Sequence, residues 1–270
     1  MGAIETRLWG NTRRRGAAYT GVGLALGTAA GRSLRSTAMA VGVSVAGREL
    51  RSVSARIADH LVRDDLASAR TDLPSLVGRD PSGLDASAIS AAVIESLAEN
   101  SVDAVFAPAF WGSIGGAAGA LGYRAVNTMD AMVGHRSERY ERFGWASARL
   151  DDAANLLPAR LFALTIMAVE PRRSHDIRQT VRRDAPHHPS PNSGVAEAAV
   201  AAALGIELGG TLRYGDRIEH RPRLGTGPRP QPLDIARTIR LTDRAERLLV
   251  AALLGVGASV IGRRAGGRQG

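Results

Sequence analysis

The sequence predicts an all-α fold, that of a polytopic helical integral membrane protein with amphipathic surface helices and a long polar loop region. Three patterns favour it: uncharged runs near the length of a membrane span, charges at helical spacing beside apolar residues, and carboxylates that recur every fourth residue. The 270 residues are enough for one large domain or two ordinary ones, and we expect a single domain over residues 1–270.

The composition excludes several kinds of chemistry. Hydrophobic residues make up 44% and charged residues 23%, and the net charge is +9. The chain has neither lysine nor cysteine, which excludes lysine Schiff bases, Lys-containing phosphate loops, thiolate nucleophiles and cysteine metal sites. Without lysine, arginine supplies the permanent positive charge, and such a bias is typical of a GC-rich genome. With 4% aromatic residues and no nucleic-acid-binding motif, we expect no nucleic-acid partner, and arginines beside apolar segments favour a lipid bilayer instead.

The first quarter of the chain predicts helices of modest length. The uncharged run 16–31 is short for a membrane span, and the run 37–47 is shorter still, so a re-entrant or soluble-core hairpin is an alternative. Charges at helical spacing predict an amphipathic surface helix over 49–70, which we expect to continue through Asp64 and Asp65. The turn-rich segment 74–85 predicts an exposed loop.

Three carboxylates then recur at intervals of four residues. Asp85 or Ser87 can cap a helix in which Glu95, Glu99 and Asp103 lie on one face. Like charges at this spacing repel, so solvent, arginines or a metal ion must offset them. An ordinary solvated acidic face is the alternative.

A long uncharged run follows these carboxylates. Ala104–Tyr123 is twenty residues without a charge, a length that fits a bilayer span, and its small residues favour close helix packing. The carboxylates are therefore expected at the mouth of a membrane segment or buried pocket. Beyond the run, Arg124, Asn127 and Asp130 share a helical face, and Gly134 is expected to end the helix.

A second helix carries further acids and amides. It follows a charged loop at 135–140 and contains Arg149, Asp151, Asp152 and Asn155 before Pro158 and Arg160. Acidic oxygens suit Mg²⁺, and arginines suit phosphate and carboxylate groups. Together these clusters indicate a site for a nucleoside triphosphate or a phosphorylated substrate.

The last third of the chain adds one candidate binding loop. The segment 188–194 contains Ser190 and Asn192 and leads into a helix through Glu197, so it is either an anion site or an ordinary turn before a helix. His187 and His188 lack convincing metal-ligand spacing, so no zinc is assigned. Residues 209–232 predict an irregular exposed segment that could lie over the substrate. An amphipathic helix at 233–247 and a marginal final span at 248–262 complete the chain.

Several blocks of the sequence resemble one known family. They read ESLAEN-x-x-D, YRAVNT-x-D-x-MVG, ERY-x-x-FGW-x-SARLDD-x-x-N, PAR and HPSPNSG. They are similar to the adenosylcobinamide-phosphate synthase family of cobalamin biosynthesis (the CbiB/CobD family), from about Ala46 onward. The resemblance implies a multi-pass protein of the bacterial inner (cell) membrane. The implied ligase joins aminopropanol or its phosphate to a carboxylate of adenosylcobyric acid by an amide bond, with Mg²⁺ as cofactor and ATP as co-substrate.

Under this hypothesis the polar residues divide into three overlapping groups. The candidate catalytic residues are Glu95, Glu99, Asp103, Asp130 and Asp152. The candidate metal ligands are Glu99, Asp103, Asp151 and Asp152. The candidate substrate-binding residues are Asn100, Arg124, Asn127, Arg149, Asn155, Arg160, Ser190 and Asn192.

Other readings of the same sequence stay open. Family members usually begin with a further hydrophobic segment bearing Asp-Pro and His-Pro elements, and we expect this chain to begin after it. A non-catalytic membrane protein that binds corrinoids or assists assembly is the main alternative to an enzyme. A soluble helical protein with solvated charges is a third. Besides the corrinoid and the amino alcohol, other cobalamin-assembly enzymes are candidate partners.

Overall fold

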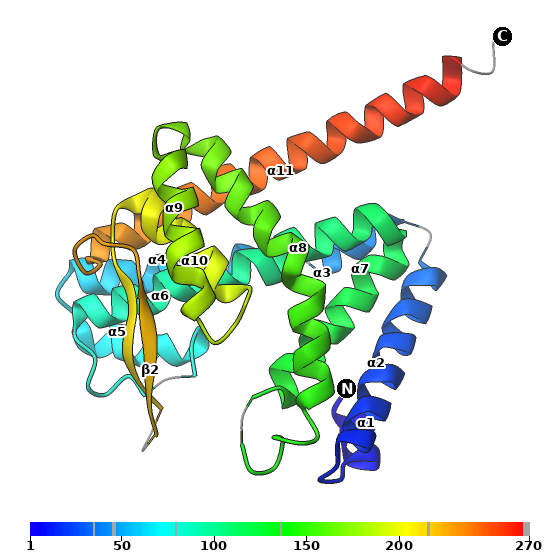
Figure 1. Cartoon of the computed structure of the whole chain (residues 1–270), viewed down its shortest axis with the longest axis horizontal. Helices are drawn as coiled ribbons and strands as arrows, with labels where there is room; N and C mark the ends of the chain where they lie inside the picture. Colours follow the sequence, from blue (N-terminus) through cyan, green and yellow to red (C-terminus); the bar gives the residue numbers. More distant parts are fainter. Residues whose placement is uncertain (35, 45–46, 79, 136, 215–216, 267–270) are drawn as a thin grey trace.

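The computed structural model describes residues 1–34, 36–44, 47–78, 80–135, 137–214 and 217–266, and most of these residues are helical (Figure 1). The prediction of a helical fold is therefore confirmed. The α-helices are α1 (Gly2–Leu8), α2 (Arg13–Ser33), α3 (Thr37–Ser44), α4 (Gly47–Val62), α5 (Leu66–Asp72), α6 (Ala86–Ser101), α7 (Ala107–Val133), α8 (Trp145–Val169), α9 (Ser174–Asp184), α10 (Ser193–Leu204) and α11 (Pro232–Gly266). Strands β1 (Leu208–Tyr214) and β2 (Arg217–Leu224) pair antiparallel.

The main hydrophobic core lies where α4, α6, α8, α10 and α11 meet. Phe106 and Phe162 are both fully buried there, with ring centroids 5.1 Å apart in an edge-to-face contact. The contact joins the segment that follows α6 to the middle of α8. It therefore fixes two elements that carry candidate site residues.

Helix α2 packs closely against α7 through a row of glycines spaced by four. A Cβ on Gly27 would lie 2.7 Å from the Leu121 carbonyl oxygen, and one on Gly31 would lie 2.4 Å from that of Ala117. Only glycine permits so close an approach of the two backbones, as in the small-residue helix contacts of membrane proteins. This packing supports the second half of α7, which carries Asn127 and Asp130.

Helix α7 reverses direction at Gly116. This residue has φ 61° and ψ −152°, a conformation that is essentially restricted to glycine. After the turn the two limbs lie together, since a Cβ on Gly119 would be 2.2 Å from the Trp111 carbonyl oxygen. The prediction of one continuous span over Ala104–Tyr123 is therefore wrong, because the run is divided between two antiparallel limbs.

Two described segments are long and apolar enough to cross a membrane, by length and composition alone. They are Ala86–Val133, which includes the reversal at Gly116, and Trp145–Val169. Half of the most apolar window of the first segment and 39% of that of the second are buried inside the protein. The helices thus serve as core elements as well as candidate spans.

The predicted surface helix over 49–70 is two helices. Asp64 adopts a positive φ of 59°, which ends the first helical segment, and the Asp65 side chain accepts a hydrogen bond from the Ser68 N–H at 3.0 Å to begin α5. Aspartate is one of the few side chains that tolerates this backbone conformation. The prediction that the helix continues through these two residues is wrong.

A third sequence prediction that differs from the structure is the irregular segment at 209–232. Much of it is the hairpin of β1 and β2, so the fold is mainly but not entirely helical. A fourth concerns the C-terminal part, where the amphipathic segment and the predicted final span form one continuous helix, α11. Figure 1 shows α11 extending away from the body of the molecule towards the C-terminus.

Candidate functional site

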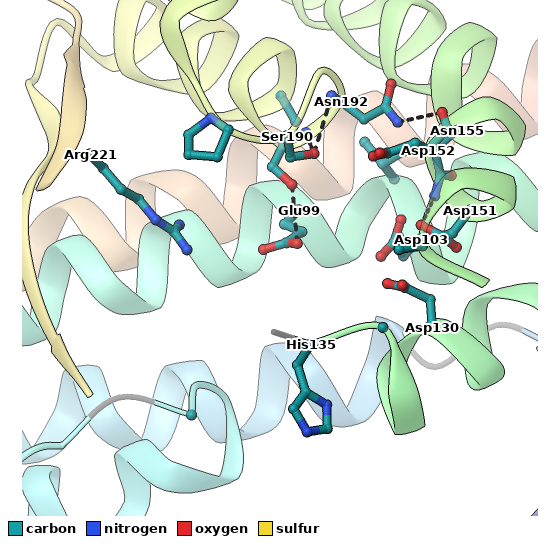
Figure 2. Close-up of a pocket in the computed structure, with 17 residues that line it drawn as sticks. Glu99, Asp103, Asp130, His135, Asp151, Asp152, Asn155, Ser190, Asn192 and Arg221 are labelled. Atoms are coloured by element: carbon teal, nitrogen blue, oxygen red, sulfur yellow. Dashed lines mark hydrogen bonds between the residues drawn. The ribbon is translucent and has the colours of Figure 1, made fainter. Parts of the chain in front are cut away.

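A cavity of about 900 Å³ lies between the end of α6, the facing parts of α7 and α8, the loop before α10, and β2. Its polar lining is dominated by carboxylates, and Figure 2 shows most of them gathered on one side. The acidic lining residues are Glu99, Asp103, Asp130, Asp151 and Asp152. The sequence predicted all five for the site, and the fold brings them together from α6, the short helical segment between α6 and α7, α7 and α8.

A π-helical turn places Asp103. The turn spans Val102–Phe106, between α6 and α7, and such turns occur frequently at functional sites because they widen the helix locally. Glu99 and Asp103 line the cavity, whereas Glu95 does not. Glu95 is 3% exposed and accepts a hydrogen bond from the Gly209 N–H at 2.9 Å. The structure thus places the candidate catalytic residue Glu95 at the base of the hairpin.

One amide links two of the carboxylates. The Asn127 Nδ2 group donates to Asp103 Oδ2 at 3.2 Å and to Asp151 Oδ1 at 3.4 Å. Arg124 Nη1 donates to Asn127 Oδ1 at 3.1 Å, which orients the amide. Asn127 and Arg124, both candidate substrate-binding residues, thus hold the acidic wall of the cavity.

Tyr123 and Asn155 complete this network from the other side. Asn155 Nδ2 donates to Asp151 Oδ2 at 3.0 Å, and the Tyr123 hydroxyl donates to Asn155 Oδ1 at 2.9 Å. The same hydroxyl lies 3.4 Å from Asp103 Oδ1. Because a hydroxyl carries one hydrogen, the shorter contact is the better donor bond. Sequence reasoning missed Tyr123, whose position at the end of an apolar run indicated only packing.

The remaining carboxylates have fewer protein partners. Glu99 Oε1 accepts a hydrogen bond from Ser193 Oγ at 3.1 Å. Asp130 and Asp152 border the cavity from α7 and α8. Within the described part of the chain, no group of three or more Asp, Glu or His side chains could by itself hold a metal ion. Mg²⁺ is usually held by only one or two carboxylates together with phosphate oxygens and water, so this donor set fits an ion shared with a phosphorylated substrate.

The loop before α10 forms another wall. Ser190 Oγ accepts hydrogen bonds from the N–H groups of Asn192 and Ser193 at 3.3 and 3.2 Å, so Ser190 satisfies two backbone donors at the start of α10. Asn192 Nδ2 donates to the Asp152 carbonyl oxygen at 2.7 Å. Ser190 and Asn192 therefore both line the cavity, and Asn192 also joins this loop to α8.

Five predicted substrate-binding residues lie outside the cavity lining: Asn100, Arg124, Asn127, Arg149 and Arg160. Arg160 Nη1 donates to Asn192 Oδ1 at 2.9 Å and supports the loop from behind. Asn100 Nδ2 donates to the Ser96 carbonyl oxygen at 3.0 Å, within its own helix. Arg149 also lies outside the lining, whereas Arg221, on β2, is part of it. Sequence reasoning missed Arg221 because the hairpin was predicted as an irregular segment.

A buried histidine lies behind the loop. His188 is 8% exposed, and its Nδ1 atom is 3.1 Å from both the amide nitrogen and the carbonyl oxygen of Ser190. Its Nε2 atom faces Glu197 Oε1 at 3.8 Å. Burial lowers the pKa of His188, and the charge of Arg221 lowers it further, although the hydrogen bond with the Ser190 backbone and the charges of Glu99 and Glu95 oppose this. His188 therefore favours the neutral form at neutral pH.

This histidine predicts how stability depends on pH. The unfolded His188 has a pKa near 6.5, above that of the folded form, so its contribution to stability is complete above about pH 6.5 and is lost as pH falls towards the folded pKa. We expect the melting temperature of His188→Asn to fall less between pH 7.5 and 5.5 than that of the wild type. Thermal unfolding in detergent measures this. His175→Asn, at a side chain 87% exposed, is the control and should keep the wild-type slope.

The fold and the cavity define a class of protein: a mainly helical chain with two apolar segments of membrane-spanning length and a large acidic site beside them. The comparisons with known proteins are more specific. The chain belongs to the CobD/Cbib protein family, whose model matches residues 12–242. The family resemblance predicted from the sequence blocks is thereby confirmed.

Curated relatives are closely similar over much of their length. The cobalamin biosynthesis protein CobD of Rhodobacter capsulatus is 48% identical over 202 residues, which cover 74% of this chain and 64% of that protein. The protein of the same name from Mycobacterium tuberculosis is 45% identical over 226 residues, covering 82% and 72% respectively. The chain thus matches slightly less than two thirds of the Rhodobacter protein. No solved structure showed significant similarity to this chain.

Proposed function

We propose that this protein acts in cobalamin biosynthesis as an amide-forming ligase. It would join aminopropanol, or its phosphate, to a carboxylate of adenosylcobyric acid, using ATP and Mg²⁺. Its family membership supports the pathway, and the cavity with five lining carboxylates is the observation that supports catalysis. The proposal includes a multi-pass location in the cell membrane, supported by the two apolar segments.

Amide formation in water needs an activated carboxylate. In the proposed reaction, a corrinoid carboxylate oxygen attacks the γ-phosphorus of ATP, which gives an acyl phosphate and ADP. The amine nitrogen then attacks the acyl carbon, and inorganic phosphate leaves with the bonding electron pair. The proton lost by the amine passes to a base.

The cavity carboxylates suit the proton and charge requirements of this reaction. One carboxylate of the cavity would take the proton from the amine, which must be neutral to attack. Asp103 and Asp151, linked by Asn127, are the most firmly oriented pair, whereas Asp130 and Asp152 have fewer protein contacts. Bound Mg²⁺ would supply charge neutralisation on the phosphate oxygens, with ligands drawn from Glu99, Asp103, Asp151 and Asp152.

The test is formation of the amide product. Protein purified in detergent is incubated with adenosylcobyric acid, ATP, Mg²⁺ and either aminopropanol or aminopropanol phosphate, and the products are identified by mass spectrometry. We expect one amide bond per ATP converted to ADP and phosphate. Corrinoid binding without any amide would contradict the enzyme and favour a carrier.

Metal removal gives a second, separate measurement. EDTA should abolish amide formation, and Mg²⁺ added in excess should restore it, because the phosphate charge is no longer offset without the ion. An unchanged rate in EDTA would remove Mg²⁺ from the proposal. Replacing ATP by its β,γ-methylene analogue should likewise yield no amide.

A further inference from the structure

The cavity is charged unevenly from one end to the other. Among its described lining residues Arg221 is the only arginine, opposite five carboxylates. Figure 2 shows it reaching in from β2, across the cavity from Asp103, Asp130 and Asp151, with Glu99 between. An anionic group is repelled at the acidic end, whereas a guanidinium offers it several parallel donors. The two ends therefore suit different parts of a bound substrate.

The hairpin that carries Arg221 is attached firmly at its base. Leu208 and Leu224, which pair at the start of the hairpin, are fully buried in the main core. Arg221 is paired with Gly210, and the strand register shifts between Leu208 and Gly210. Such a bulge re-aims the side chains that follow it. The position of Arg221 thus depends on the backbone at Gly209.

Two side chains hold that backbone. Buried Glu95 accepts from the Gly209 N–H at 2.9 Å, and Arg229 Nη1 donates to the Gly209 carbonyl oxygen, also at 2.9 Å. Gly209 has φ 75°, and a Cβ there would lie 2.1 Å from the Pro222 carbonyl oxygen. A conformation that only glycine can adopt is therefore fixed on both sides by charged groups.

From this geometry we infer that Arg221 binds a substrate oxyanion, phosphate or carboxylate, at the end of the cavity away from the aspartates. Glu95 is a positioning residue that acts on Arg221 through Gly209. This inference rests on the proposed function for the identity of its substrates. The oxyanion can belong to aminopropanol phosphate, to ATP or to adenosylcobyric acid, and the experiment distinguishes these sources.

The first experiment compares Arg221→Gln with the wild type by steady-state kinetics, varying each of the three substrates in turn. Loss of a charge-assisted contact should raise KM about 10- to 100-fold for the substrate that carries the bound oxyanion. The KM values for the other two substrates should change less than about twofold. A lost contact worth about 1.4 kcal/mol would change them tenfold. Unchanged KM values for all three substrates would overturn the inference.

Arg223→Gln is the matched control on the same strand. Its side chain is 67% exposed and pairs with Glu207 at 2.5 Å, outside the cavity lining. Arg223→Gln removes the same charge from the hairpin as Arg221→Gln does. A general electrostatic effect on KM would therefore appear equally in both variants. We expect wild-type KM values for Arg223→Gln, and an equal rise in both variants would contradict the assignment.

Glu95 variants separate positioning from general stability. Glu95→Ala should raise the same KM as Arg221→Gln, whereas Glu95→Gln, whose amide oxygen can still accept from Gly209, should restore most of the wild-type value. If Glu95→Ala lowered kcat for every substrate alike without altering that KM, Glu95 would have only a structural role.

Direct binding keeps this test independent of turnover. Isothermal titration of wild type and Arg221→Gln with each of the three substrates reports affinity even if no amide forms. If Arg221→Gln binds one oxyanion-bearing compound more weakly than the wild type and binds unphosphorylated aminopropanol equally well, that result supports the inference even when no amide forms. Equal affinities of the two proteins for all three compounds would overturn it.

Discussion

Asp103→Asn is expected to lower the rate of amide formation roughly 10²- to 10⁴-fold, the contribution typical of a positioned acid–base group. Asn fills the same volume and removes only the charge and the ability to take a proton. Its side chain can keep both neighbours, because its oxygen accepts from Asn127 while its NH₂ donates to the Tyr123 hydroxyl. The measurement is kcat, together with corrinoid affinity.

The control for this prediction is a carboxylate of the same type outside the cavity. Asp176→Asn, on α9, changes a side chain that is 61% exposed, so turnover should remain at the wild-type level. We expect Asp103→Asn to bind corrinoid as the wild type does. A turnover within about threefold of the wild type would remove Asp103 from the catalytic residues, since a general acid or base is normally worth far more.

The second large effect concerns two adjacent glycines, for which alanine should have opposite effects. Gly116→Ala should lower the free energy of unfolding by about 1–3 kcal/mol, because its backbone occupies a region almost restricted to glycine. Space is not the cause, since a Cβ would only touch Thr37 Oγ1 at 3.5 Å. Gly115→Ala should raise that free energy by about 0.5–1 kcal/mol, because Gly115 is helical and a Cβ there meets nothing within 4 Å.

Unfolding in detergent, measured side by side for the two variants, checks this prediction. Gly116→Ala should also reduce turnover more than Gly115→Ala does, because the reversal at Gly116 brings Asn127 back to Asp103. If both variants shifted stability in the same direction, the backbone conformation at Gly116 would not be the source of the effect.

Local signals in the sequence predicted the start of α6 and the end of α7 correctly. Asp85 caps α6 by accepting from the Ala88 N–H at 2.8 Å, and α7 ends at Val133, before the predicted stop at Gly134. These predictions succeed because caps and stops depend on a few neighbouring residues. The break at Asp64 was missed, since a positive φ at aspartate carries little signal in the sequence.

The three carboxylates spaced by four residues show where helical periodicity stops predicting which side chains reach the site. Regular spacing placed Glu95, Glu99 and Asp103 on one face, yet only the last two line the cavity. The helix widens to a π turn at Val102–Phe106, and Glu95 is taken up by the hairpin more than one hundred residues later in the chain. The spacing of residues along one helix does not predict a hydrogen-bond partner that lies in a distant segment of the chain.

The sequence by itself determined the helical character and the family, and it predicted six candidate carboxylates, of which five line the cavity, because each of these depends on residue type and local order. Only the tertiary structure decided that the twenty-residue run turns back at Gly116, that Asn127 joins Asp103 to Asp151, and that Arg221 faces them from a hairpin. These contacts join segments far apart in the chain. Their geometry depends on how whole helices and strands pack, for which no short pattern of residues is diagnostic.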